Sequence, residues 1–390
     1  MRFRLLQQDI FSFVEAGPDS QLHKAALVPT EGKEYVFASC FSDNPAELKL
    51  ASFTAGKLEL KTTVTFSDYI VNLLCVQLTA KEKHHIKQID KSFGDECLLA
   101  VLTSKTIYFY NVSQGKLISQ FERFYPRGVR YIPLELKRPS SHLGCDGLLA
   151  VITVGKVFIF DWIRRKLVMS LQTVGLSDLD FCKVFNGSLY FAGVLSIHQK
   201  ATADPEEDGY GQLMSVYNLK TKKRVKSIYL EAYYGNYNLL FTEVCLEGGG
   251  RKGLFLCLVN SVMQIVWNLN GGEIIFKSTQ YDCKIQKTLS MEPIRSCTMN
   301  ALRMKEINGI GAIYELKVDG VSSTKDKGEE PDQIKVSVKN IESPKNNKIV
   351  SYFESECGNI VFGGIETEGE QEERNSSPVL SLYEVILETE

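Results

Sequence analysis

The chain has 390 residues and a formal net charge of −2, and 44% of its residues are hydrophobic and 10% aromatic. This composition supports a packed core and excludes an intrinsically disordered protein. No apolar run reaches the roughly 18 residues of a membrane-spanning helix, so we expect none. The N-terminus turns polar after Leu5 and Leu6, which is not the pattern of a signal peptide.

A short phrase recurs along the chain. In each copy an apolar strand ends in an aromatic residue, followed by Asn or Asp, an apolar residue, a polar turn and a second apolar strand. The clear copies are Tyr110-Asn111-Val112-Ser113-Gln114-Gly115-Lys116-Leu117, Phe160-Asp161-Trp162-Ile163-Arg164-Arg165-Lys166-Leu167, Tyr217-Asn218-Leu219 and Trp267-Asn268-Leu269. Recurrence of this kind indicates a repeat architecture.

Three weaker copies fit the same register. The first starts at Ala51, the second is Lys339-Asn340-Ile341 before a longer turn that ends at Lys348-Ile349, and the third is Tyr383-Glu384-Val385. The anchors therefore lie near positions 51, 110, 160, 217, 267, 339 and 383, and the residue before each is apolar. Alternation of this kind is typical of half-buried strands.

Further apolar strands precede each phrase, as at Leu98 to Thr103 and Leu148 to Thr153. Four strands per unit, at roughly 40 to 60 residues per unit, predict an all-β protein with one β-propeller domain over residues 1–390. Seven anchors favour seven blades over six. The segment from Arg2 to Val14 has no blade of its own, so we expect it to supply the outer strand of the last blade and to close the ring.

The phrase with Leu98-Leu99-Ala100, Tyr110-Asn111-Val112 and Gly115-Lys116 resembles the WD40 repeat, whose units end in an aromatic-Asp dipeptide before a Gly-Lys turn. The chain departs from that family because no unit carries an upstream Gly-His dipeptide and Asn replaces Asp in three of the four clear copies. The resemblance implies a divergent WD40-like propeller that lacks the hydrogen-bond tetrad by which that family braces its blades.

The resemblance also implies a geometry in which the loops between second and third strands open on one face of the disc. Loops 201–211, 320–332 and 365–377 would then make that face acidic and flexible. The other face would collect the first-to-second loops, including the basic loop from Lys81 to Lys91, and the third-to-fourth turns. Its bases would be Lys57, Lys81, Lys83, Lys87, Lys91, Lys116, Lys137, Arg138, Arg164, Arg165, Lys166, Lys220, Lys222, Lys223, Arg224, Lys345 and Lys348.

Two readings of this asymmetry stay open, because long loops and turns are commonly polar for solvation alone. The functional reading is two docking faces of opposite charge. The candidate partner-binding residues are Arg164, Arg165, Lys166, Lys220, Lys222, Lys223 and Arg224, with Tyr233, Tyr234 and Tyr237 from the aromatic connection that follows the fourth unit. That connection could equally pack on its own blade.

Catalytic and metal sites are not expected. The ten cysteines form no Cys-x-x-Cys pair and read as buried, reduced thiols, so we expect no structural metal and no cofactor. His84 and His85 lie in the basic loop, where solvated histidines are far commoner than ligands or bases. The run from Gly248 to Gly253 joins two strands and opens no helix, so it lacks a phosphate cradle.

These observations favour a non-catalytic scaffold that binds other subunits of an intracellular assembly in the nucleus or cytoplasm. Coat or nuclear-pore, ribosome-assembly and chromatin complexes all remain possible. The alternative is a nucleic-acid-binding propeller that uses its basic face, although the basic turns contain few aromatics for stacking, Trp162 being the nearest. A third hypothesis is an enzyme with its site in the central channel, for which no convergent polar cluster is visible.

Overall fold

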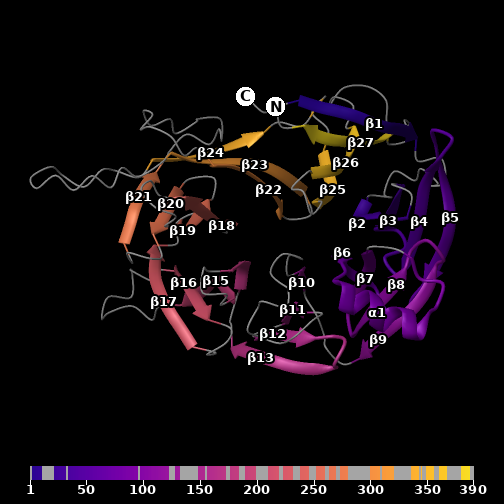
Figure 1. The fold of residues 1–390 in the computed structure, drawn as a ribbon, viewed down its shortest axis with the longest axis horizontal. Coiled ribbons are helices and arrows are strands. Elements are labelled where there is room, and N and C mark those ends of the chain that lie inside the picture. The colour runs from indigo at the N-terminus through magenta and orange to yellow at the C-terminus, as the bar shows by residue number, and fades with distance from the viewer. Residues whose placement is uncertain are drawn as a thin grey trace, which may run out of the picture.

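The computed structural model describes residues 2–10, 22–31, 34–94, 97–122, 128–131, 148–153, 156–172, 176–183, 189–198, 210–218, 223–231, 238–245, 252–259, 263–268, 273–279, 299–307, 310–319, 335–341, 344, 348–354, 360–366 and 379–386. The described strands form antiparallel sheets that follow one another in chain order around a ring (Figure 1). This arrangement confirms the expected β-propeller.

Five sheets have four strands each, joined in sequence order. The first holds β2 (Leu22–Pro29), β3 (Tyr35–Phe41), β4 (Glu47–Thr54) and β5 (Lys57–Thr65), and the second holds β6 (Ile70–Gln77), β7 (Cys97–Thr103), β8 (Thr106–Asn111) and β9 (Lys116–Glu122). The third holds β10 (Gly128–Tyr131), β11 (Leu148–Thr153), β12 (Lys156–Asp161) and β13 (Lys166–Gln172). The fourth holds β14 (Leu176–Lys183), β15 (Leu189–His198), β16 (Tyr210–Asn218) and β17 (Lys223–Glu231), and the fifth holds β18 (Asn238–Cys245), β19 (Lys252–Val259), β20 (Met263–Asn268) and β21 (Glu273–Thr279).

The remaining strands form one larger sheet of two parts. One part is β22 (Met299–Ile307), β23 (Ile310–Asp319) and β24 (Lys335–Ile341), and the other is β25 (Lys348–Glu354), β26 (Ile360–Glu366), β27 (Val379–Ile386) and β1 (Arg2–Ile10). A single residue pair, Gly311 with Ile349, joins the two parts. When they are counted as separate blades, the described sheets make seven.

The repeat reading assigned Lys348-Ile349 to the end of the sixth unit's turn, but these residues begin β25. Along its length β25 pairs with β26, so it belongs to the last blade. The structure also shows β25 in contact with β2 of the first blade, which places it on the inner side of the ring.

The N-terminal strand closes the ring as expected. β1 pairs antiparallel with β27 from Arg2 opposite Ile386 to Ile10 opposite Val379, and the Arg4 side chain pairs with Glu384. Figure 1 shows β1 lying along β27 on the outside of the last blade. Because β27 is thereby covered, it presents no open edge to another chain.

A β-bulge marks the repeated phrase. In the first five sheets the register between the third and fourth strands shifts at the anchor, for example between Phe109 and Tyr110 and between Ile159 and Phe160. The pairing of β1 with β27 has the same shift, because Leu5 faces Tyr383 and Gln7 faces Leu382. β1 therefore occupies the fourth-strand position of the last blade in the same register as its counterparts, and the extra residue bends each outer strand.

The core lies between neighbouring sheets. One cluster of buried side chains joins the second sheet, with Leu98, Leu102 and Phe109, to Leu149 and Phe160 of the third. Corresponding clusters join the first sheet to the second and the last blade to the first. The first and second blades are thus each packed against both of their neighbours, which keeps their connections at fixed positions.

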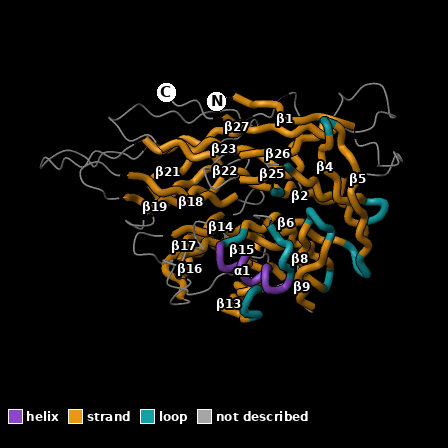
Figure 2. The backbone as a smooth tube through the Cα atoms, turned by 45° about the vertical axis from the view of Figure 1, so that its right-hand side comes forward, coloured by secondary structure: helices purple, strands orange, loops and turns teal. Residues whose placement is uncertain are grey.

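The one helix of the described residues is α1 (Ala80–Ile89), drawn in purple in Figure 2. It connects β6 to β7. We expected this basic segment to be a loop, and that expectation was wrong. The Thr79 hydroxyl accepts a hydrogen bond from the Glu82 amide at 3.2 Å, and the Glu82 carboxylate accepts one from the Thr79 amide at 2.7 Å. This capping box starts the helix, and burial of Ile86 holds its inner side.

Candidate interaction face

We call the surface made by α1, residues 90–94 and the turns 112–115 and 162–165 the turn face. Its elements come from two neighbouring blades, because α1 and turn 112–115 belong to the second sheet and turn 162–165 to the third. Side-chain contacts join all of these elements.

Glu82 fastens α1 to the third blade. Besides closing the capping box, its carboxylate accepts a hydrogen bond from the indole Nε1 of Trp162 at 3.1 Å, and neither side chain is more than 1% exposed. Trp162 stacks on Phe109 of β8, with ring centroids 4.7 Å apart and an interplanar angle of 19°. The edge of His85 meets the same indole at 6.2 Å between ring centroids. One buried tryptophan thus binds the helix, β8 and the third blade together.

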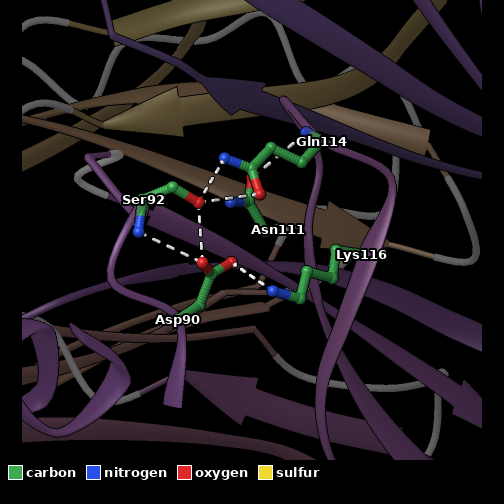
Figure 3. A network of polar contacts seen from close by, with 5 residues as sticks. All are labelled: Asp90, Ser92, Asn111, Gln114 and Lys116. Atoms are coloured by element: carbon green, nitrogen blue, oxygen red, sulfur yellow. Dashed lines mark hydrogen bonds and ion pairs between the residues drawn. The ribbon is translucent and has the colours of Figure 1, made fainter. Parts of the chain in front are cut away.

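A polar network fixes the segment after α1 to the turn that follows β8 (Figure 3). The Ser92 hydroxyl donates a hydrogen bond to Asp90 Oδ1 at 2.7 Å, and the side-chain Nε2 of Gln114 donates one to the Ser92 hydroxyl at 3.0 Å. The Lys116 ammonium lies 3.1 Å from Asp90 Oδ2. Hydrogen bonds from Ser92 and then from Lys116 lower the pKa of Asp90 below its ordinary value. The network confirms that these two connections of the second sheet open on the same face.

The Asn or Asp of the repeated phrase caps the turn that it begins. Asn111 Oδ1 accepts a hydrogen bond from the backbone N–H of Gln114 at 3.3 Å, and Asp161 Oδ1 accepts one from the backbone N–H of Arg164 at 3.0 Å. Both side chains are buried. Because either an amide or a carboxylate oxygen can accept this bond, Asn replaces Asp in the phrase without loss of the turn.

The last residue of each turn has a left-handed backbone. Gly115 has φ +61° in the second blade, and Arg165 has φ +50° at the corresponding place in the third. Glycine adopts this conformation readily, whereas a residue with a Cβ pays roughly 1 kcal/mol or more for it. Arg165 therefore occupies a position that glycine fills in the first and second blades, at Gly56 and Gly115.

A groove of about 710 Å³ lies beside this turn, between the end of β9 and the β12–β13 hairpin. Its lining is Gln120, Phe121, Glu122, Phe158, Phe160, Arg165 and Leu167. The ring of Phe121 meets Phe160 edge-on at 5.1 Å, and the guanidinium of Arg165 lies over Phe121 at 5.2 Å from the ring centroid. Leu167 is 48% exposed, so a large aliphatic side chain stands open on one wall.

The structure places half of the predicted partner-binding residues. Arg164, Arg165 and Lys166 are exposed at the β12–β13 hairpin, and Trp162 and Glu82 join this hairpin to α1. Lys223 and Arg224 are exposed at the start of β17, which is the equivalent position in the next blade. The other predicted residues, Lys220, Lys222, Tyr233, Tyr234 and Tyr237, lie outside the described residues.

The predicted acidic face also lies largely outside the described residues. Of loops 201–211, 320–332 and 365–377, only the ends that belong to β16 and β26 are described. Sequence reasoning missed the groove, because it placed Phe121 in the connection after the second unit and Phe160 at the anchor of the third, and nothing in the sequence places them beside Arg165. It also missed the role of Trp162, for which the Thr79-x-x-Glu82 capping signal offered a partial sign.

Within the described ranges, no group of three or more His, Cys, Asp or Glu side chains is arranged to hold a metal ion. His84, one of the two histidines considered for such a role, is exposed and lies 3.2 Å from the Gln88 amide one turn along α1. Among these same residues, no helix has both the length and the hydropathy needed to cross a membrane.

No protein-family model matches the sequence, and no curated protein matches it. Among solved structures, the chain is similar to one from the crystal structure of the mitotic checkpoint complex, with 9% identity, 98% of this chain and 93% of that chain covered, and a TM-score of 0.48. It is also similar to the WD40 domain of coronin from Toxoplasma gondii, with 9% identity, coverage of 99% and 87%, and a TM-score of 0.49.

Proposed function

We propose that the protein is a non-catalytic propeller scaffold that holds partner proteins within a larger intracellular assembly. The observation that carries this proposal is the construction of the turn face, where buried contacts of Glu82, Trp162 and Asp90 fix exposed bases from two blades in one frame. A preorganised charged surface binds a partner without the entropic cost of ordering its own side chains and loops.

The exposed bases of this face include Lys87 and Lys91 near the end of α1 and Arg164, Arg165 and Lys166 at the hairpin. Their partner is expected to present acidic groups. A coat or nuclear-pore complex, a ribosome-assembly complex and a chromatin complex would each offer such a partner. Trp162, the aromatic residue within the basic β12–β13 turn, is 1% exposed and is therefore not available to stack on a nucleic-acid base.

The test is affinity purification of the tagged protein at native level, with mass spectrometry of the co-purifying chains. Wild type should return a small set of stoichiometric partners. The double variant Lys87→Glu/Lys91→Glu should lose one of them, because it reverses charge on the turn face. If wild type returns alone, or with nucleic acid only, the scaffold proposal fails.

The matched control is Lys105→Glu/Lys156→Glu, which makes the same change in net charge. Both lysines are exposed, and they lie at the ends of the third strands opposite the turn face: Lys105 comes just before β8, and Lys156 is the first residue of β12. This control should keep the partner that Lys87→Glu/Lys91→Glu loses. Equal loss in both double variants would indicate an effect of net charge alone and would contradict a role for the turn face.

A further inference from the structure

We propose that the groove between β9 and the β12–β13 hairpin binds an extended acidic peptide segment of a partner protein, with one bulky apolar residue seated against Leu167 and a carboxylate bound by Arg165. This inference rests on the proposed scaffold function and names the chemistry of one of its partners.

The walls offer an apolar seat. Phe121 and Phe160 are less than 10% exposed and form the back of the groove, whereas Leu167 stands open at its side. An apolar side chain from a partner would bury surface of Leu167 and of the rings that is otherwise wet, at roughly 25 cal/mol per Å². A groove of about 710 Å³ has room for several residues of an extended chain.

One wall is also a sheet edge. β9 is the last strand of the second sheet, so one row of its backbone amides and carbonyls points away from β8. Gln120, Phe121 and Glu122, at the end of this strand, line the groove. An extended peptide can pair with such an edge while its alternate side chains enter the pocket.

The same place is filled differently where the last blade meets the first. Asp9 of β1 corresponds in register to Phe121 of β9. Asp9 pairs with Leu380 and Phe121 pairs with Ile107, and each of these facing residues lies three positions before the anchor of its blade. The Asp9 carboxylate accepts a hydrogen bond from the amide of Leu58 in β5 at 2.6 Å. That junction is therefore closed by a contact within the chain, whereas the junction at Phe121 has a groove.

Arg165 gives the groove its charge preference. The guanidinium lies over the Phe121 ring beside the groove, 5.2 Å from its centroid, and Arg164 and Lys166 flank Arg165 on the same turn. A guanidinium in this position can present two of its N–H donors to a carboxylate, which they fit bidentately. Glu122 lies on the opposite wall and disfavours acids there, so the peptide's carboxylate is expected at the Arg165 end.

The backbone of Arg165 supports a functional role. Its left-handed φ of +50° costs stability that a glycine at this place would not, as Gly115 shows in the second blade. Residues with such unfavourable backbone conformations are frequent at binding sites, where the interactions of the side chain offset the cost of the strain. Arg165→Gly should therefore leave stability nearly unchanged while removing the group that binds the carboxylate.

The experiment is a selection of displayed random decapeptides on the immobilised full-length protein, followed by fluorescence anisotropy with the most enriched peptide carrying fluorescein. Enriched peptides should combine at least two acids with one Leu, Ile, Phe or Met. Binding should fall at least tenfold in Arg165→Gly and in Leu167→Lys. Replacing the peptide's acids by their amides should weaken binding to wild type by a similar factor.

The matched control is Leu117→Lys. Leu117 is 41% exposed, faces Tyr110 as Leu167 faces Phe160, and does not line the groove. It should bind the peptide as wild type does, and all variants should match wild type in circular dichroism and melting temperature to within a few degrees.

Several results would overturn the proposal. These are enrichment of peptides without acids, no enrichment at all, or equal weakening by Leu117→Lys and Leu167→Lys. A concentration-dependent dimer that Leu167→Lys dissociates would place a second copy in the groove and would also overturn it. If native partners co-purify unchanged with Leu167→Lys, the groove proposal fails while the scaffold stands. A wild type without any partner would remove the scaffold whatever the peptides do.

Discussion

Removing the Glu82 carboxylate tests whether α1 is held to the third blade by the contact that the structure shows. In Glu82→Ala the indole N–H of Trp162 would remain buried without its acceptor, which costs about 1 to 3 kcal/mol. Loss of the capping box adds about 1 kcal/mol. Part of this cost is offset because a buried carboxylate no longer has to be desolvated. We therefore expect a net loss of about 2 to 3 kcal/mol in the free energy of unfolding.

Glu82→Gln separates the shape of the contact from its charge. Glutamine also serves in a capping box and keeps an oxygen that can accept from Trp162, so its cost should be under about 1 kcal/mol. Gln88→Ala, an exposed change on the same helix, should cost no more than about 0.5 kcal/mol.

The measurement is urea unfolding followed by circular dichroism, with hydrogen exchange of residues 80–94 as a local readout. Exchange in this segment should accelerate in Glu82→Ala and stay unchanged in Gln88→Ala. A double-mutant cycle with Trp162→Phe should give a coupling of about 0.5 to 3 kcal/mol, since the two side chains share one hydrogen bond. If Glu82→Ala costs less than about 0.5 kcal/mol, or if the cycle is additive, the bracing role is refuted.

Three further predictions concern the described core and network. Trp162→Ala should cost about 3 to 5 kcal/mol in urea unfolding, because it empties the space between Phe109 and α1, and a smaller cost would mean that the site collapses around it. Because the pKa of Asp90 is lowered in the folded protein, its contribution is present above the unfolded pKa of about 4 and is lost as the pH falls through the folded pKa. The difference in melting temperature between wild type and Asp90→Asn should therefore decrease from pH 7 to pH 3. A difference that stays constant would contradict a stabilising role of the Asp90 carboxylate. Burial raises the pKa of Cys40 to about 12, so its thiol should react with a disulfide reagent at pH 8 only after unfolding, and prompt reaction in the native protein would show that it is accessible.

The parts of the fold that follow from a repeating pattern could be predicted from the sequence. The anchors near 110 and 160 fall in the third strands of their blades, and the N-terminal strand closes the ring through Leu5 opposite Tyr383. These features are visible because strand alternation has a period of two and because a strand without its own blade must pair somewhere.

Where the pattern is weak, the prediction was less good. The sixth copy has no aromatic and a long turn, so Lys348-Ile349 was assigned to the wrong blade. The helix α1 is only ten residues long and mostly charged, and its alternation does not show a buried face, although Thr79 and Glu82 carried a capping signal. The groove could not be predicted, because it depends on how far apart two neighbouring blades stand at their outer strands.

Two positions at which the third blade departs from the second build the candidate site. Where the second blade has Val112 after its anchor pair, the third has Trp162, whose larger side chain reaches Glu82 in another blade. Where the second has Gly115, the third has Arg165, which adopts a left-handed backbone and places its guanidinium over Phe121. Folding explains the residues that the repeats share. A residue that differs from the repeat and introduces backbone strain or a buried polar contact therefore calls for an explanation other than folding. In this chain two such departures lie in one turn, beside the groove, and binding a partner there would account for Arg165 as folding alone does not.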